Sequence, residues 1–151
     1  MIVLTATPRV GSYWSMIMVE DRTPLRYQAL PARGVAVSTI MRYGVQIASH
    51  ISGTGAPRIT FSSPVMEDGT VNIDVSNAGT LACRPALRLE VYGASGTIAA
   101  TFTSQRGLLY PETSLRQKFA LKDLAPGTYT ALLVADVGGS ELFGVRYQIV
   151  R

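Results

Sequence analysis

The apolar residues of this chain fall into short runs that alternate with polar residues and are separated by Gly, Pro and Asn. The clearest run is residues 70–77, in which Val71, Ile73 and Val75 alternate with polar side chains. A period of two places successive side chains on opposite faces of a β-strand. The same pattern predicts further strands at residues 57–63, 86–92, 97–103, 105–110, 114–121, 129–136 and 143–150. Because no stretch shows a convincing helical period, the sequence predicts an all-β fold.

A corner motif indicates how these strands are arranged. The segment Asp-Leu-Ala-Pro-Gly-Thr-Tyr at residues 123–129 leads directly into the strand at 129–136. In immunoglobulin-like sandwiches, a Tyr at such a corner donates its hydroxyl hydrogen bond to backbone a few residues upstream. Seven or eight short strands with frequent turns are also typical of that architecture. The sequence therefore predicts an immunoglobulin-like antiparallel β-sandwich over residues 58–151, with Tyr129 at its corner.

The first third of the chain shows a different pattern. Residues 12–20 form a strongly apolar strand, residues 21–33 a polar loop, and residues 34–51 a long alternating run with its apolar side chains at odd positions. At ~3.3 Å per residue, the long run would extend ~55 Å, so we expect it to bend at Gly44 or to pass between domains. Residues 53–57 then form a short hinge.

Two extra strands cannot bury both faces of a sheet by themselves, and an isolated hairpin is marginal in water. We therefore interpret residues 1–52 as the closing strands of an incomplete first β domain. These strands must pack on the sandwich, pair with another copy of the chain, or be completed by a foreign strand.

Composition narrows the classes of function. The chain has 151 residues, is 47% hydrophobic and 16% charged, and carries a formal net charge of +4. Its fourteen basic residues are scattered, which argues against nucleic-acid binding. Charged residues and Gly interrupt every apolar stretch, so no membrane span is expected. The first nine residues lack the basic leader and apolar core of a secretory signal peptide.

Candidate chemistry is sparse. A single cysteine, Cys83, excludes an internal disulfide and favours a small buried side chain. A single histidine, His50, favours a structural or solvent-facing imidazole over a general base or metal ligand. Tyr13 and Trp14 favour a core or interface over a ligand platform. We expect no enzyme, no cofactor, no metal and no small-molecule substrate. An enzyme remains an alternative only if the apolar strand at residues 13–19 lines a pocket with arginines.

Three features resemble the two-domain periplasmic pilus-assembly chaperones: the long alternating strand, the short joint, and the sandwich with its corner at residues 125–129. In that family, two immunoglobulin-like domains are joined by a hinge, and the last strand of the first domain lends alternate apolar side chains to an incomplete pilin subunit. The resemblance covers a whole second domain but only the closing strands of a first. It implies a periplasmic or cell-envelope location. It also implies a set of partner-binding residues: Val35, Val37, Met41, Arg42, Tyr43, Val45 and Trp14.

Two functions follow from this sequence. The first is a non-enzymatic bacterial cell-envelope protein that binds a protein partner, or a second copy of itself, by β-strand augmentation through residues 12–51. The alternative is a structural or adhesive immunoglobulin-like module of a larger surface protein, without chaperone activity.

Overall fold

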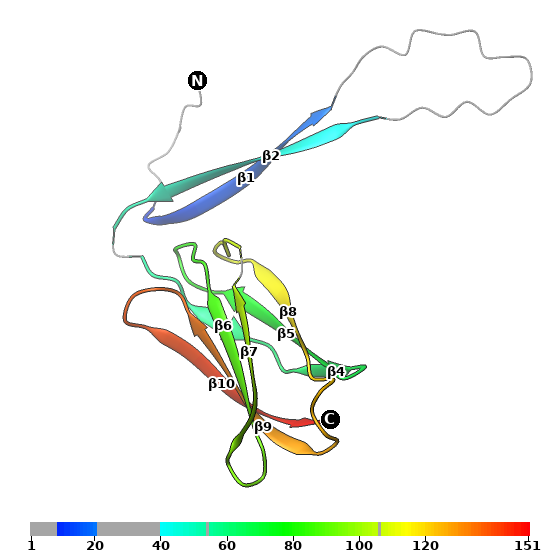
Figure 1. Cartoon of the computed structure of the whole chain (residues 1–151). Helices are drawn as coiled ribbons and strands as arrows, with labels where there is room; N and C mark the ends of the chain where they lie inside the picture. Colours follow the sequence, from blue (N-terminus) through cyan, green and yellow to red (C-terminus); the bar gives the residue numbers. More distant parts are fainter. Residues whose placement is uncertain (1–8, 21–39, 54, 106) are drawn as a thin grey trace, which may run out of the picture. The chain divides into compact units, whose positions relative to one another are not determined.

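The computed structural model describes residues 9–20, 40–53, 55–105 and 107–151, and every regular element within them is a β-strand (Figure 1). The strands are β1 (Gly11–Glu20), β2 (Arg42–Ile51), β3 (Ile59–Phe61), β4 (Val65–Glu67), β5 (Thr70–Asn77), β6 (Ala86–Tyr92), β7 (Ile98–Gln105), β8 (Ser114–Ala120), β9 (Thr128–Asp136) and β10 (Leu142–Val150). The predicted all-β class is confirmed.

The strands form three sheets. Strands β1 and β2 pair with each other in a two-stranded sheet, which we call the ribbon. Sheet I has the order β10-β9-β6-β7, and all its pairings are antiparallel. In sheet II, β3 and β4 pair with one edge of β5 and β8 pairs with the other, again antiparallel. The described residues divide into one unit of residues 9–13 and 50–151 and a second unit within residues 14–49.

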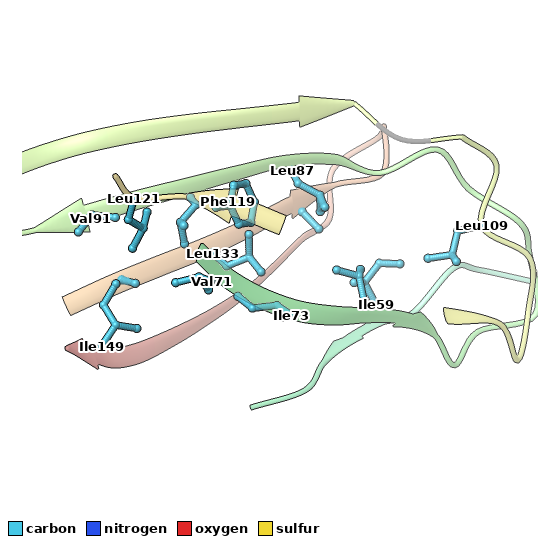
Figure 2. Close-up of a cluster of buried hydrophobic side chains, with 14 of the residues drawn as sticks. Ile59, Val71, Ile73, Leu87, Val91, Leu109, Phe119, Leu121, Leu133 and Ile149 are labelled. Carbon is cyan, nitrogen blue, oxygen red and sulfur yellow. The ribbon is translucent and has the colours of Figure 1, made fainter. Parts of the chain in front are cut away.

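Sheets I and II share one hydrophobic core, as expected for a β-sandwich (Figure 2). Ile73 of β5, Leu89 of β6 and Leu133 of β9 are almost completely buried in it. Each such side chain contributes about 1.5–3 kcal/mol relative to an exposed one. Eight further core members alternate along their strands: Val71, Val75, Leu87, Val91, Phe119, Ala131, Ala135 and Ile149. The alternation seen in the sequence is therefore the inward face of each sheet.

The predicted corner is present. The hydroxyl of Tyr129, in β9, donates a 2.8 Å hydrogen bond to the carbonyl oxygen of Ala125. A second tyrosine links the two sheets at an edge, because the Tyr147 hydroxyl donates to the carbonyl oxygen of Ser62 at 2.6 Å. Burial raises the pKa of Tyr147, so it remains a protonated donor.

Asn77, at the end of β5, is a buried polar centre that the sequence pattern suggested only as a turn residue. It is 1% exposed. Its amide nitrogen donates to the carbonyl oxygens of Leu81 (2.8 Å) and Leu109 (3.2 Å). Its side-chain oxygen accepts from the backbone N–H groups of Arg58 (3.2 Å) and Gly79 (3.0 Å). One side chain thus satisfies backbone groups of three separate loops.

Several predicted strands differ from the structure. Residues 57–63 form only the short β3, and the next strand, β4, follows Pro64 where the sequence predicted a stop. The predicted strand at residues 105–110 is wrong. Leu109 makes only an isolated bridge, exchanging backbone hydrogen bonds with Cys83 at 2.8 and 3.1 Å. Pro111, which has no N–H donor, follows Tyr110 and limits backbone pairing at the end of the predicted strand.

Within the described residues, the strand predicted at residues 34–51 begins later than predicted. β2 begins at Arg42, so Ile40 and Met41 lie outside the strand. The reason is that Arg42 lies beside Glu20, the last residue of β1, and pairing ends where the partner strand ends. β2 also runs through Gly44 without interruption. The part of the prediction at residues 34–39 lies outside the described residues.

Candidate protein-binding ribbon

Two contacts define the register of the ribbon. The guanidinium Nε of Arg42 lies 2.8 Å from the Glu20 carboxylate. A Cβ placed on Gly44 would lie 3.0 Å from the sulfur of Met16 and 3.6 Å from that of Met18. Gly44 lies two residues after Arg42 on β2, and Met18 lies two residues before Glu20 on β1, so the strands are antiparallel. Residues whose numbers add to 62 lie opposite each other and share a face.

One face of the ribbon, the methionine face, carries Trp14, Met16, Met18, Glu20 and Arg42. The missing side chain of Gly44 leaves the space over which the two methionine sulfurs lie. Methionine is unbranched and adapts to irregular surfaces. The Glu20–Arg42 pair closes this face at one end, and both side chains remain exposed.

The other face, the valine face, carries Ile17, Val19, Met41, Tyr43 and Val45. The Tyr43 hydroxyl lies 3.7 Å from the Met41 sulfur, so Met41 continues the row beyond the end of β2. No residue of this face is charged. β-Branched and aromatic side chains of this kind are the ones that pack well on a pleated surface.

Large apolar side chains are exposed on both faces. The nine between Trp14 and Val45 are 45–59% exposed: Trp14, Met16, Ile17, Met18, Val19, Ile40, Met41, Tyr43 and Val45. A half-buried strand normally hides one face, as β5 and β6 do in the sandwich. The large apolar side chains of the ribbon are instead about half exposed on both faces.

The edges of the ribbon are also open. Within the described chain, β1 pairs only with β2 and β2 only with β1. Among the described residues, and apart from Ser12 and Trp14, each strand therefore keeps one row of backbone N–H and C=O groups outside the β1–β2 pairing. Such a row can form hydrogen bonds with another extended chain.

Backbone and side-chain hydrogen bonds hold the start of β1 to the sandwich. Ser12 is 6% exposed, and its N–H donates to the carbonyl oxygen of Thr80 at 2.8 Å. Its hydroxyl oxygen accepts from the N–H of Ala82 at 2.9 Å and lies 2.8 Å from His50 Nδ1. Gly11 has φ of +150°, and a Cβ there would lie 2.9 Å from the Thr80 oxygen, so only glycine fits.

The structure separates the residues expected to bind a partner. Met41, Tyr43 and Val45 lie together on the valine face, as their alternation predicted. Trp14 and Arg42 lie on the methionine face instead. Val35 and Val37 lie outside the described residues.

Ile17 and Val19, which complete the valine face, were missing from the prediction. The opposite charges of Glu20 and Arg42 are the sequence feature that could have identified them, because that pair sets the register.

Two further residues were singled out in the sequence, His50 and Cys83. His50 is exposed and contacts Ser12, as a structural imidazole does. Cys83 is buried, and burial raises the pKa of its thiol, which favours the unreactive protonated form. Within the described residues, no group of three or more His, Cys, Asp or Glu side chains is placed to hold a metal ion.

A depression on sheet I, lined by Arg88, Thr103, Asp136 and Leu142 among others, has a volume of about 650 Å³. It is widely open, and its lining contains no histidine or cysteine.

No family model matches the sequence, and no curated protein matches it either. In the part of the chain that is described, no helix is long and apolar enough to cross a membrane.

Proposed function

We propose that this protein is a non-enzymatic interaction protein of a bacterial cell envelope, similar to the pilus-assembly chaperones. It binds a protein partner by β-strand augmentation at the edges of the ribbon. The observation that carries the proposal is a ribbon with two open edges and large apolar side chains exposed on both faces.

The exposed area supports a binding role. A fully exposed side chain of this size offers roughly 150–200 Å², so nine half-exposed ones present on the order of 800 Å². The largest apolar patch on a typical monomer is about 300–600 Å², and larger ones mark interaction sites. A standard protein interface buries about 800 Å² on each partner. The nine side chains are divided between the two faces of the ribbon, so a partner meets this whole area only if it contacts both faces.

The topology of the sandwich supports the immunoglobulin-like part of the proposal. The strands can be labelled as in the immunoglobulin-like fold. With β3 and β4 as strand A, strand B is β5, strand C is β6, strand E is β8, strand F is β9 and strand G is β10. Sheet II then contains A, B and E, and sheet I contains G, F and C, with β7 beside C. This division of strands is the one expected for an immunoglobulin-like fold, and the hydrogen bond of Tyr129 to Ala125 is the one expected at its corner.

Trp14 allows a direct test, because it is the only tryptophan in the chain and lies in β1. The probe is a synthetic ten-residue peptide of alternating valine and threonine with a lysine added at each end. The control peptide carries N-methyl groups on three consecutive central residues, which remove donors on both of its edges. We expect the first peptide to change Trp14 emission saturably and the methylated peptide to bind at least ten-fold more weakly.

Amide hydrogen exchange locates the binding. Augmentation protects amides of β1 or β2, whereas amides of β7, a sandwich edge strand without charged residues, keep their exchange rates. Equal binding of the two peptides, or protection confined to β7, refutes the proposal. If neither peptide binds, the alternative function, a structural or adhesive module of a larger surface protein, is favoured.

A further inference from the structure

We propose that the valine face of the ribbon packs against the same face of a second copy of this chain. The inference rests on the proposed role of the ribbon as a binding element, and it names a partner for a surface that edge pairing does not use. Two ribbons then form a small four-stranded sandwich, in which the valine faces are inside and the methionine faces outside.

Charge favours self-association through this face. Ile17, Val19, Met41, Tyr43 and Val45 are uncharged, and toward the start of β1 the register adds Tyr13, Ser15, Ile47 and Ser49, which are uncharged too. The charged residues of β1 and β2, Glu20 and Arg42, pair with each other on the opposite face. Two valine faces can therefore meet without burying an unpaired charge, which would otherwise be costly.

The area fits a dimer of moderate affinity. The five side chains of the valine face are 49–57% exposed. At roughly 150–200 Å² for each fully exposed side chain, one face presents on the order of 450 Å², and two faces bury about 900 Å² together. This lies near the lower limit of about 1,000 Å² for specific interfaces, so we expect a dimer that dissociates on dilution.

The geometry of this contact is closed and leaves the ribbon edges open. A two-fold axis places the same patch on both copies, so the contact ends at two chains instead of growing into a fibre. Face-to-face sheets lie about 10 Å apart and interact through side chains alone. The outer edges of β1 and β2 therefore remain available for strand augmentation.

Neighbouring residues on opposite faces supply matched variants. Val45→Lys places a charge on the valine face, and Gln46→Lys places the same charge one residue later on the methionine face. Ile17→Lys and Met18→Lys form a second pair on β1. All four positions are exposed, and none belongs to the core of the sandwich.

The experiment is sedimentation velocity on the full chain from low micromolar to several hundred micromolar concentration. We expect a reversible monomer–dimer equilibrium, weakened at least ten-fold by Val45→Lys and Ile17→Lys. Gln46→Lys and Met18→Lys should change the dissociation constant less than three-fold. Trp14 emission should stay constant across the transition, because Trp14 lies on the outer face. An unchanged thermal unfolding midpoint establishes that each variant is folded.

Three results would overturn the inference: a wild-type chain that stays monomeric at every concentration, equal weakening by both members of a pair, or a shift of Trp14 emission on dimerisation. The peptide titration reports on edge pairing independently. Loss of the dimer with retained peptide binding refutes only the face-to-face contact, whereas a dimer without peptide binding refutes only the augmentation.

Discussion

The Ser12 hydroxyl oxygen lies 2.8 Å from Nδ1 of His50, and this contact joins the start of β1 to the end of β2. The same oxygen accepts a hydrogen bond from the Ala82 N–H. Since that donor already points at the oxygen, the hydroxyl hydrogen is free to be donated to an unprotonated Nδ1. The Ser12 side chain therefore connects the start of β1 and the end of β2, which we call the base of the ribbon, to the loop before β6.

Ser12→Ala should destabilise this base more than His50→Ala does. The first change leaves the Ala82 N–H without its acceptor and should cost about 1–2 kcal/mol, whereas the second removes one bond of an exposed imidazole and should cost about 0.5 kcal/mol. Urea unfolding measures both free energies, and exchange of the Ala82 amide should accelerate only in Ser12→Ala. Equal effects of the two variants would mean that the Ala82 contact contributes nothing.

Tyr129→Phe tests the corner of the sandwich. Losing the 2.8 Å hydrogen bond to the Ala125 carbonyl oxygen should cost about 1 kcal/mol, because the benzene ring still fills the same space. The control is Tyr43→Phe, whose hydroxyl contacts only the Met41 sulfur on the ribbon. The midpoint of thermal unfolding should fall for the first variant and stay constant for the second. An unchanged midpoint in Tyr129→Phe would show that the corner bond is replaced by water at no cost.

The sequence predicted strands well where alternation ran over seven or eight residues. β5 and β6 have the bounds that the pattern of Val71, Ile73, Val75 and their counterparts indicated. β4 was missed because three residues after a proline carry no measurable period. The strand predicted at 105–110 is wrong because Leu109 and Tyr110 are buried in an irregular loop. In the sequence, buried apolar residues of a loop look the same as the inward-facing residues of a strand.

The candidate site was predicted only as far as one strand could show it. Met41, Tyr43 and Val45 follow from alternation along β2. Their neighbours Ile17 and Val19 depend on the register between two strands, which the contact between Glu20 and Arg42 sets across 22 residues of sequence. Single-strand patterns contain no such information.

Asn77 illustrates the same limit in the core, and it supports a further prediction. The Asn-Ala-Gly sequence suggested a turn, yet the partners of the side chain include the carbonyl oxygen of Leu109, 32 residues away. Asn77→Ala should cost about 3 kcal/mol, because several backbone groups lose their partner inside the protein.

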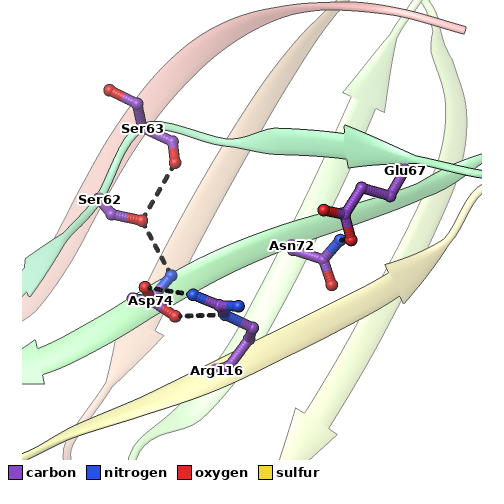
Figure 3. Close-up of polar contacts among 6 residues, drawn as sticks. All are labelled: Ser62, Ser63, Glu67, Asn72, Asp74 and Arg116. Atoms are coloured by element: carbon purple, nitrogen blue, oxygen red, sulfur yellow. Dashed lines mark hydrogen bonds and ion pairs between the residues drawn. The ribbon is translucent and has the colours of Figure 1, made fainter.

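The control for Asn77 is Asn72→Ala. Asn72 is also buried, but its side-chain amide donates to one exposed group, the Glu67 carboxylate, at 3.2 Å (Figure 3). We expect this variant to lose about 1 kcal/mol or less. Urea denaturation at neutral pH measures both. If the two variants lost equal stability, the several contacts of Asn77 would have no combined effect.

The outer face of sheet II gives a prediction of pH dependence. Arg116 in β8 donates to both carboxylate oxygens of Asp74 in β5, at 2.8 and 3.0 Å (Figure 3). The hydrogen bond from Arg116, with a smaller contribution from its charge, lowers the pKa of Asp74 below its ordinary value. A lowered carboxyl pKa stabilises the folded state above the ordinary value, and this contribution is lost as the pH falls through the lowered one.

Asp74→Asn should therefore be less stable than the wild type from neutral pH down to about pH 5, and the difference should shrink below about pH 4. Arg116→Gln should show the same pH profile, and the double variant should be no worse than either single one, because each change removes the same pair. Added salt should reduce the difference at neutral pH, since both side chains are solvent-exposed. Urea unfolding at several pH values measures all three variants. A difference that persists unchanged at pH 2 would show that Asp74 acts through packing and not through its charge.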